Sequence, residues 1–258
     1  MSRHNEKMRD LYDKKLELYE KGDERGDIYK NYREQEKVIE NIFSSEDIFE
    51  RADETQQIQK DKTLQNVLLK VSVLDSFYST NLTRSKFGVY KVAKHIAELE
   101  SNKQIHQKIR NANPQNYNEL KDIVKQIAKC NLEKTIKDKV IIINPYSFAT
   151  KYCFHHNQNA FRIYDSFVRE VLVFFNNGKS DTSNAKFNIP SKLVGTNFYG
   201  KKLTNKELKD YDTYNTFLQA IDEFAKHYGL ENENTRDLDH FLWILGKENR
   251  IDKKETIG

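Results

Sequence analysis

Lys151 and Asp165, 14 residues apart, are the residues of this sequence whose types and surroundings fit covalent chemistry. A lysine amine that has lost its proton attacks electrophilic carbon and can form a Schiff base. Partial burial of Lys151 among Phe148, Tyr152 and Phe154 favours the neutral amine. Asp165 is expected at the N-terminus of a helix, where the positive end of the helix dipole keeps a carboxylate ionised.

Each of these residues also has a simpler interpretation. Asp165 is a good N-cap residue, and a capping role alone would explain its position. Lys151 is one of 43 Lys and Arg residues, and most lysines lie at the surface. Residue types alone leave both alternatives open.

Metal chemistry has little support in the sequence. His155 and His156 are adjacent and would point to different faces of a helix, and no carboxylate or third histidine is spaced to complete a site. Cys130 and Cys153 are the only cysteines, too few for a four-cysteine zinc site or iron–sulfur cluster. We expect no metal, no organic cofactor and a reducing, cytoplasmic compartment.

The composition favours long helices. The 258 residues include 9 Gly and 3 Pro, whereas sandwiches and barrels need such residues at many turns. No apolar run reaches about 18 residues, so no membrane span is expected. The first ten residues, MSRHNEKMRD, are polar and include acids, which is unlike a signal or transit peptide.

Positive charge is concentrated in the middle of the chain. Residues 1–60 carry 12 basic and 16 acidic residues, 61–83 carry 2 and 2, 84–209 carry 23 and 10, and 210–258 carry 6 and 11. Such a concentration of positive charge is needed to neutralise the phosphates of a nucleic acid. A lysine-rich solvated face is the alternative.

Apolar residues at helical spacing predict the elements that position Lys151 and Asp165. Residues 1–60 are predicted to form a charged helical extension that packs on the core by one face. Further helices are predicted over 64–79, 87–99, 117–130, 145–156, from Asp165, over 214–228 and over 238–245. The last two are predicted to close at Gly229 and Gly246.

Between these helices, the Asn-rich segment 102–118 is predicted to be a loop with a short helical turn. Residues 140–143 are too short a run to assign. Asn144 is a predicted N-cap and Pro145 a first helical residue. Residues 176–202 are predicted to form a basic ordered loop or hairpin, and Thr204 with Glu207 a capping box. The class is all-α, with an extension over 1–60 and a core over 61–258.

Three segments of residues 60–250 resemble the helix-hairpin-helix DNA glycosylases, the superfamily of endonuclease III and 8-oxoguanine glycosylase. The second, NPYSFATKYCFHHNQNAFRIYDSFVREVL, carries most of the resemblance. Ser147-Phe148-Ala149 stands where the family has Gly-Val-Gly. Lys151 falls on its catalytic lysine, and Tyr164-Asp165 falls on the pair that holds its catalytic aspartate. Ser and Ala replace glycines that permit close phosphate approach, and the Lys-to-Asp interval is slightly short.

The other two segments are LLKVSVLDSFYSTNLTRSKFGVYKVAKHIAEL and RDLDHFLWILGK. In the first, Tyr78, Ser79, Thr80 and Asn81 fall on a family turn that faces DNA, where one residue fills the gap left by a flipped base. The second resembles the family's closing helix, which ends in a Gly-basic pair, here Gly246-Lys247. Core packing is the expected role of Leu242 and Trp243.

The resemblance implies a two-lobed helical fold and a DNA N-glycosylase, with AP-lyase activity through Lys151 and activation by Asp165. The expected partner is double-stranded DNA with a damaged or modified base, bound by a monomer through Tyr78, Ser79, Thr80, Asn81, Ser147 and Ala149. Base excision repair and defence against modified foreign DNA are both compatible roles. The alternatives are a non-catalytic DNA-binding protein with the same fold and a helical protein-interaction domain.

Overall fold

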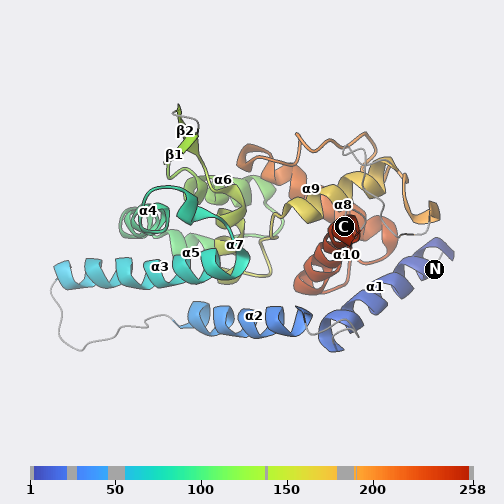
Figure 1. Ribbon diagram of the computed structural model, residues 1–258, viewed down its shortest axis with the longest axis horizontal. Helices are drawn as coiled ribbons and strands as arrows, with labels where there is room; N and C mark the ends of the chain where they lie inside the picture. Colours follow the sequence, from blue (N-terminus) through green and yellow to red (C-terminus); the bar gives the residue numbers. More distant parts are fainter. Residues whose placement is uncertain are drawn as a thin grey trace. The chain divides into compact units, whose positions relative to one another are not determined.

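The computed structural model describes residues 3–21, 28–45, 56–136, 139–178, 189 and 191–255. Over these ranges the chain is mostly helical, with ten α-helices, three 3-10 helices and a single two-stranded sheet (Figure 1). The predicted helical class is confirmed, with a β-hairpin added. None of the helices in these ranges is long and apolar enough to cross a bilayer.

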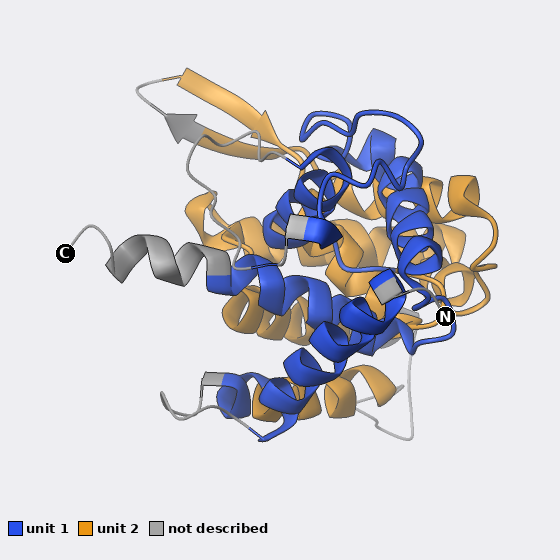
Figure 2. Ribbon diagram, turned by 90° about the vertical axis from the view of Figure 1, so that its right-hand side faces the viewer, with its two compact units in different colours: residues 1–32, 162–258 blue, residues 33–161 orange. Residues whose placement is uncertain are grey.

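The chain divides into two compact units (Figure 2). Unit 1 consists of Met1–Tyr32 and Arg162–Gly258, and unit 2 is Arg33–Phe161. The predicted boundary between residues 60 and 61 falls inside helix α3 (Gln56–Tyr78). The predicted extension therefore contributes to both units.

Unit 2 is built around helix α7 (Tyr146–His156), of which Tyr146 and the seven residues from Phe148 to Phe154 are buried. Helices α3, α5 and α6 pack on α7, and α3 also packs on α4. The remaining helices of this unit are α2 (Ile28–Ser44, which begins in unit 1), η1 (Leu82–Arg84), α4 (Gly88–Lys103), α5 (Ile105–Arg110) and α6 (Tyr117–Ala128). The predicted short helical turn within 102–118 is α5.

A β-hairpin joins α6 to α7 and occupies the segment before Asn144, where the glycosylase resemblance would place the first helix of the helical hairpin, while Ser147-Phe148-Ala149 lies within helix α7 and forms no loop. Strands β1 (Leu132–Ile136) and β2 (Lys139–Ile143) pair antiparallel, with Leu132 opposite Ile143. Both Figures 1 and 2 show the hairpin extending away from the helices of unit 2. The β-branched run left unassigned by its length is β2, and its Val140, Ile141 and Ile142 are exposed.

Unit 1 is built from α1 (Arg3–Lys21), α8 (Ser166–Asn177), α9 (Tyr214–Tyr228) and α10 (Thr235–Glu255). Helix α8 packs on α10 and α9, and α1 packs on the same two helices. Met8, Tyr12 and Tyr19 of α1 are buried, so the predicted packing of this amphipathic helix by one face is confirmed. Gly229 ends α9 in left-handed backbone, as predicted.

The predicted end of the last helix at Gly246 is wrong, because α10 continues through Gly246-Lys247 to Glu255. A Cβ atom at Gly246 would lie 2.6 Å from the Cβ of Phe167 and 2.8 Å from its carbonyl carbon and oxygen. The glycine therefore permits the close approach of α10 to α8. Leu242 is fully buried, and Trp243 packs on a cluster that includes Tyr19 and Tyr29, so their predicted core role is confirmed.

Gly246→Ala should destabilise the protein, because its methyl group meets backbone atoms of α8 that cannot rotate away. Overpacking of this kind costs roughly 1–3 kcal/mol of the free energy of unfolding. Thermal denaturation of the variant and the parent measures the loss. An unchanged melting temperature would show that the two helices do not approach as described.

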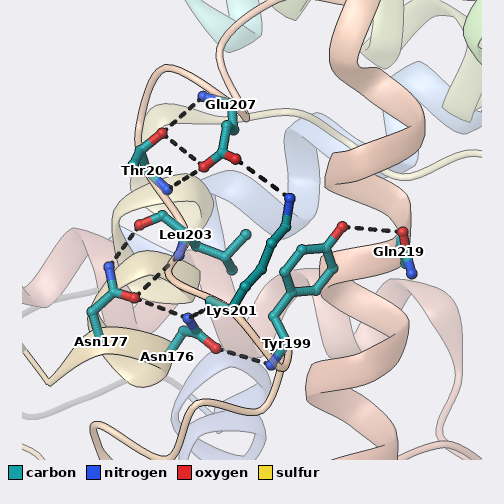
Figure 3. A network of polar contacts seen from close by, with 8 residues as sticks. All are labelled: Asn176, Asn177, Tyr199, Lys201, Leu203, Thr204, Glu207 and Gln219. Atoms are coloured by element: carbon teal, nitrogen blue, oxygen red, sulfur yellow. Dashed lines mark hydrogen bonds and ion pairs between the residues drawn. The ribbon is translucent and has the colours of Figure 1, made fainter.

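Two asparagines at the end of α8 hold the segment that leads towards α9 (Figure 3). Asn176 Nδ2 donates to the Lys201 carbonyl and Asn177 Nδ2 to the Leu203 carbonyl, at 2.8 and 2.6 Å. Thr204 and Glu207 form the predicted reciprocal capping bonds, but they close a turn and no α-helix follows directly. The 3-10 helices η2 (Ser191–Leu193) and η3 (Tyr211–Thr213) flank this segment. Residues 179–188 and 190 of the predicted basic loop lie outside the described residues.

Candidate active site

Helix α7 presents Lys151 from its second turn. The helix begins at Tyr146 with Pro145 as N-cap residue, one position later than predicted, and no side chain caps it. Two aromatic residues predicted to surround Lys151, Phe148 and Tyr152, are 1% and 0% exposed. Burial of nearly the whole helix surface places Lys151 in the interior, where lysine is rare unless its charge has partners.

Lys151 is 2% exposed, and its Nζ atom contacts Ser147 and Tyr78 within unit 2. The Nζ atom donates a hydrogen bond to Ser147 Oγ at 2.6 Å, one turn earlier on α7. The same atom lies 5.3 Å from the centroid of the Tyr78 ring, within the range of a cation–π interaction. The alternative that Lys151 is a surface lysine is therefore wrong.

The predicted DNA-facing turn follows directly from α3, so two sequence segments predicted to act together meet in unit 2. Ser79 and Asn81 are exposed, with φ of 49° and 64° in the left-handed region, while Thr80 is half-buried. Asp75 fixes the turn, because its Oδ1 accepts from Thr80 Oγ1 at 2.6 Å and from the Leu82 N–H at 2.9 Å. Asp75 was not among the predicted site residues.

The two predicted DNA-binding residues on α7, Ser147 and Ala149, differ in burial and in their hydrogen bonds. Ser147 is half-buried and bonds to Lys151. Ala149 is fully buried and its N–H donates to the Pro145 carbonyl at 2.9 Å. Ala149 therefore presents neither its side chain nor its N–H to a phosphate, because both are used in the helix.

Asp165 caps helix α8 in unit 1, as predicted. Its backbone is extended, and its Oδ1 accepts from the Phe167 N–H at 2.8 Å. Tyr214 holds the chain just before it, since its hydroxyl donates to the Arg162 carbonyl at 2.7 Å and accepts from the Arg162 N–H at 2.9 Å. The capping geometry fixes the carboxylate and by itself leaves its functional role open.

The two adjacent histidines of α7 enter different environments within unit 2. His155 Nε2 lies 2.9 Å from Tyr78 Oη, whereas His156 stacks on His106 with ring centroids 4.7 Å apart. His106 in turn bonds to Tyr152 Oη at 2.8 Å and lies 3.3 Å from Glu100 Oε2. In the described ranges, no three or more His, Cys, Asp or Glu side chains are grouped so as to hold a metal ion.

Burial sets the protonation of His156. Desolvation, aided by His106, Lys70, Arg110 and His155, lowers the pKa of His156 well below its usual 6.5. Below about pH 6.5 the unfolded chain therefore binds a proton at this residue that the folded chain does not bind. The free energy of unfolding should fall with decreasing pH, at up to about 1.4 kcal/mol per pH unit from this residue.

His156→Phe keeps the ring contacts with His106, Phe43 and Tyr152 and removes the titration. We expect its free energy of unfolding to depend less steeply on pH between 6.5 and 5 than that of the parent. Urea denaturation at several pH values measures both slopes. Equal slopes would contradict a buried, neutral His156.

A family model named HI_0787_N, described as an N-terminal domain, matches residues 11–160, more than half of the chain. The chain belongs to this family. A protein of Haemophilus influenzae, named as an uncharacterized protein, is 30% identical over 188 residues, which cover 73% of this chain and 70% of that protein. No solved structure matches the chain.

The HI_0787_N match ends beside the boundary between the two units, since unit 2 ends at Phe161. Lys151 and Tyr78 lie within the matched residues, and Asp165 lies beyond them. The names of the family and of the relative describe no activity. The chemistry must therefore be argued from the residues.

Proposed function

We propose that this member of the HI_0787_N family is a DNA N-glycosylase, with Lys151 as nucleophile and an associated lyase activity. The observation that carries the proposal is the burial of Lys151 on α7, with its Nζ atom bonded to Ser147 Oγ and lying beside the Tyr78 ring. The helical class and the order of Lys151 and Asp165 along the chain agree with the resemblance to helix-hairpin-helix glycosylases. The two-lobed glycosylase fold is part of the proposal.

In the proposed reaction, the neutral amine of Lys151 attacks C1′ of the deoxyribose, and the bond from C1′ to the base nitrogen breaks. The base leaves with the bonding electrons and takes up a proton. The amine nitrogen gives up one proton to the departing base and a second to O4′, as the bond from C1′ to O4′ breaks and the sugar ring opens to a Schiff base. Loss of a C2′ proton to solvent then expels the 3′ phosphate and cleaves the strand. The reaction requires the nucleotide to flip out of the duplex and, because Lys151 is 2% exposed, a path to its Nζ atom to open when DNA binds.

From the resemblance alone, Asp165 is proposed to stabilise the positive charge that develops on the sugar as the base leaves. A carboxylate is suited to this role because it opposes charge that is larger in the transition state than in the ground state. The cap on α8 holds the Asp165 carboxylate in one orientation. Preorganisation of this kind avoids reorienting the group during the reaction.

Ser79 and Asn81 are proposed to meet the duplex, because they are the exposed members of the turn after α3. The turn is rigid, since Asp75 bonds it twice and Asn81 Nδ2 donates to the Ser79 carbonyl at 2.8 Å. A rigid exposed turn beside the Tyr78 ring is suited to occupy the gap in the duplex. The basic middle of the sequence would supply phosphate contacts.

The function is tested with duplexes that each hold one candidate base, such as uracil, 8-oxoguanine, an alkylated purine or a phage-type modified cytosine. Base release is measured by chromatography, and affinity at several salt concentrations by fluorescence anisotropy. We expect release from at least one duplex and an affinity that falls steeply with salt. Salt-sensitive binding without release from any duplex would support the non-catalytic alternative, and the absence of DNA binding would reject both.

A further inference from the structure

Tyr78, Lys151 and His155 form a connected group within unit 2. Lys151 and His155 are one turn apart on α7 and therefore lie on the same helix face. Tyr78, the last residue of α3, faces both, with its ring centroid 5.3 Å from Lys151 Nζ and its hydroxyl 2.9 Å from His155 Nε2. The proposed function uses Lys151 and leaves the histidine without a role.

We propose that Tyr78 and His155 are a positioning pair that holds the amine of Lys151 where a nucleotide can meet it. The inference rests on the proposed function and deepens it, because it assigns a role to a histidine that the proposed reaction does not use. The pair acts through the Tyr78 ring. His155 fixes the ring, and the ring fixes the amine.

The ring needs such a restraint because of its place in the chain. Tyr78 stands at the end of α3, and the next residue, Ser79, already has left-handed backbone. The helix therefore restrains Tyr78 from its N-terminal side only. The hydrogen bond between its hydroxyl and His155 supplies a second point of attachment.

His155 is itself held in place, so it can act as a fixed anchor. Its ring packs against Phe43 and Phe154, at centroid distances of 5.4 and 5.3 Å, and lies 5.6 Å from the Tyr78 ring. These residues come from α2 and α7 of the same unit. Rotation of the imidazole would require repacking both phenyl rings.

Lys151 gains from being held because its four-carbon stem has many conformations. Ser147 Oγ accepts a hydrogen bond from Nζ on one side, and the Tyr78 ring face contacts it on another. With both contacts, the amine occupies one position before the nucleotide arrives. Loss of such positioning lowers the rate of the covalent step more than the affinity for DNA.

The experiment compares Tyr78→Phe, His155→Ala, their double variant and His155→Gln, whose side-chain amide can reach the position of Nε2. Tyr90→Phe is the matched control, because Tyr90 is an exposed tyrosine of the same unit. Borohydride trapping gives two quantities, the rate constant at saturating DNA and the DNA concentration at half saturation. We expect Tyr78→Phe and His155→Ala each to lower the rate constant roughly tenfold and leave the half-saturation concentration unchanged.

The double variant should be no slower than either single variant, because all three lose the same hydrogen bond. His155→Gln should restore most of the rate, and Tyr90→Phe should match the parent. The positioning role would be overturned by additive losses in the double variant or by no recovery in His155→Gln. It would also be overturned by a changed half-saturation concentration with an unchanged rate constant. A merely structural role would lower the melting temperature without this pattern.

A measurement without DNA separates this inference from the proposed function. Formaldehyde with cyanoborohydride methylates lysine amines, and peptide mass spectrometry reports the extent at Lys151. We expect methylation of Lys151 to be faster in Tyr78→Phe and His155→Ala than in the parent and equally fast in the double variant. Equal rates in all proteins would reject the positioning pair, whereas a parent that forms no DNA adduct would reject the glycosylase function.

Discussion

Replacing Lys151 by alanine should reduce the borohydride-trapped DNA adduct to background. The substitution removes the nitrogen that is proposed to bond to C1′. DNA affinity should be nearly unchanged, because the exposed basic residues remain. Denaturing gel electrophoresis measures the adduct, and fluorescence anisotropy measures the affinity.

Lys70→Ala is the matched control for this variant. Lys70 is a second buried lysine of unit 2, 6% exposed, and its Nζ lies 5.3 Å from the centroid of the Phe43 ring. The two variants therefore lose the same kind of cation–π contact in the same unit. An adduct that survives in Lys151→Ala, or disappears equally in Lys70→Ala, would contradict the assignment of Lys151 as nucleophile.

Asp165→Asn should lower the rate of base release by roughly a hundredfold or more and leave the fold intact. Asn is about as good an N-cap as Asp, so the bond to the Phe167 N–H can persist. The variant loses only the negative charge, and removing one preorganised electrostatic group typically has an effect of this size. Base release under single-turnover conditions and the melting temperature are the two measurements.

Asp210→Asn provides the control, because Asp210 also caps a helix of unit 1, accepting from the Asp212 N–H at 3.1 Å. It should retain full activity. Asp165→Ala should lose activity and also about 1 kcal/mol of stability through the lost cap. Full activity in Asp165→Asn would show that Asp165 only caps α8, and the resemblance would then bear on the fold alone.

The sequence predicted helices best where a local signal determined the boundary. The Asp165 cap, the Gly229 terminus and the buried faces of α3, α4, α6 and α9 follow from short-range patterns that the structure confirms. The helix end predicted at Gly246 was wrong, because glycine is equally suited to a helix end and to a close contact between helices. Only the packing of α10 against Phe167 distinguishes the two.

The sequence identified residues of the candidate site, but it did not show which of them contact one another. Lys151 and the turn after α3 were singled out by a linear resemblance, and they meet in unit 2. The bond between Tyr78 and His155 joins residues 77 positions apart, which no local pattern encodes. For the adjacent histidines, the sequence offered a metal pair as the one functional role to consider and disfavoured it, because sequence cannot show which neighbour each ring meets.

As the proposed nucleophile, the Lys151 amine bonds covalently to the sugar of a modified nucleotide. The most direct measurement is peptide mapping by mass spectrometry of the parent protein after borohydride trapping on the duplex that shows base release. We expect a single reduced deoxyribose remnant on the peptide that contains Lys151. A remnant on any other lysine, or base release without a trapped adduct, would contradict it.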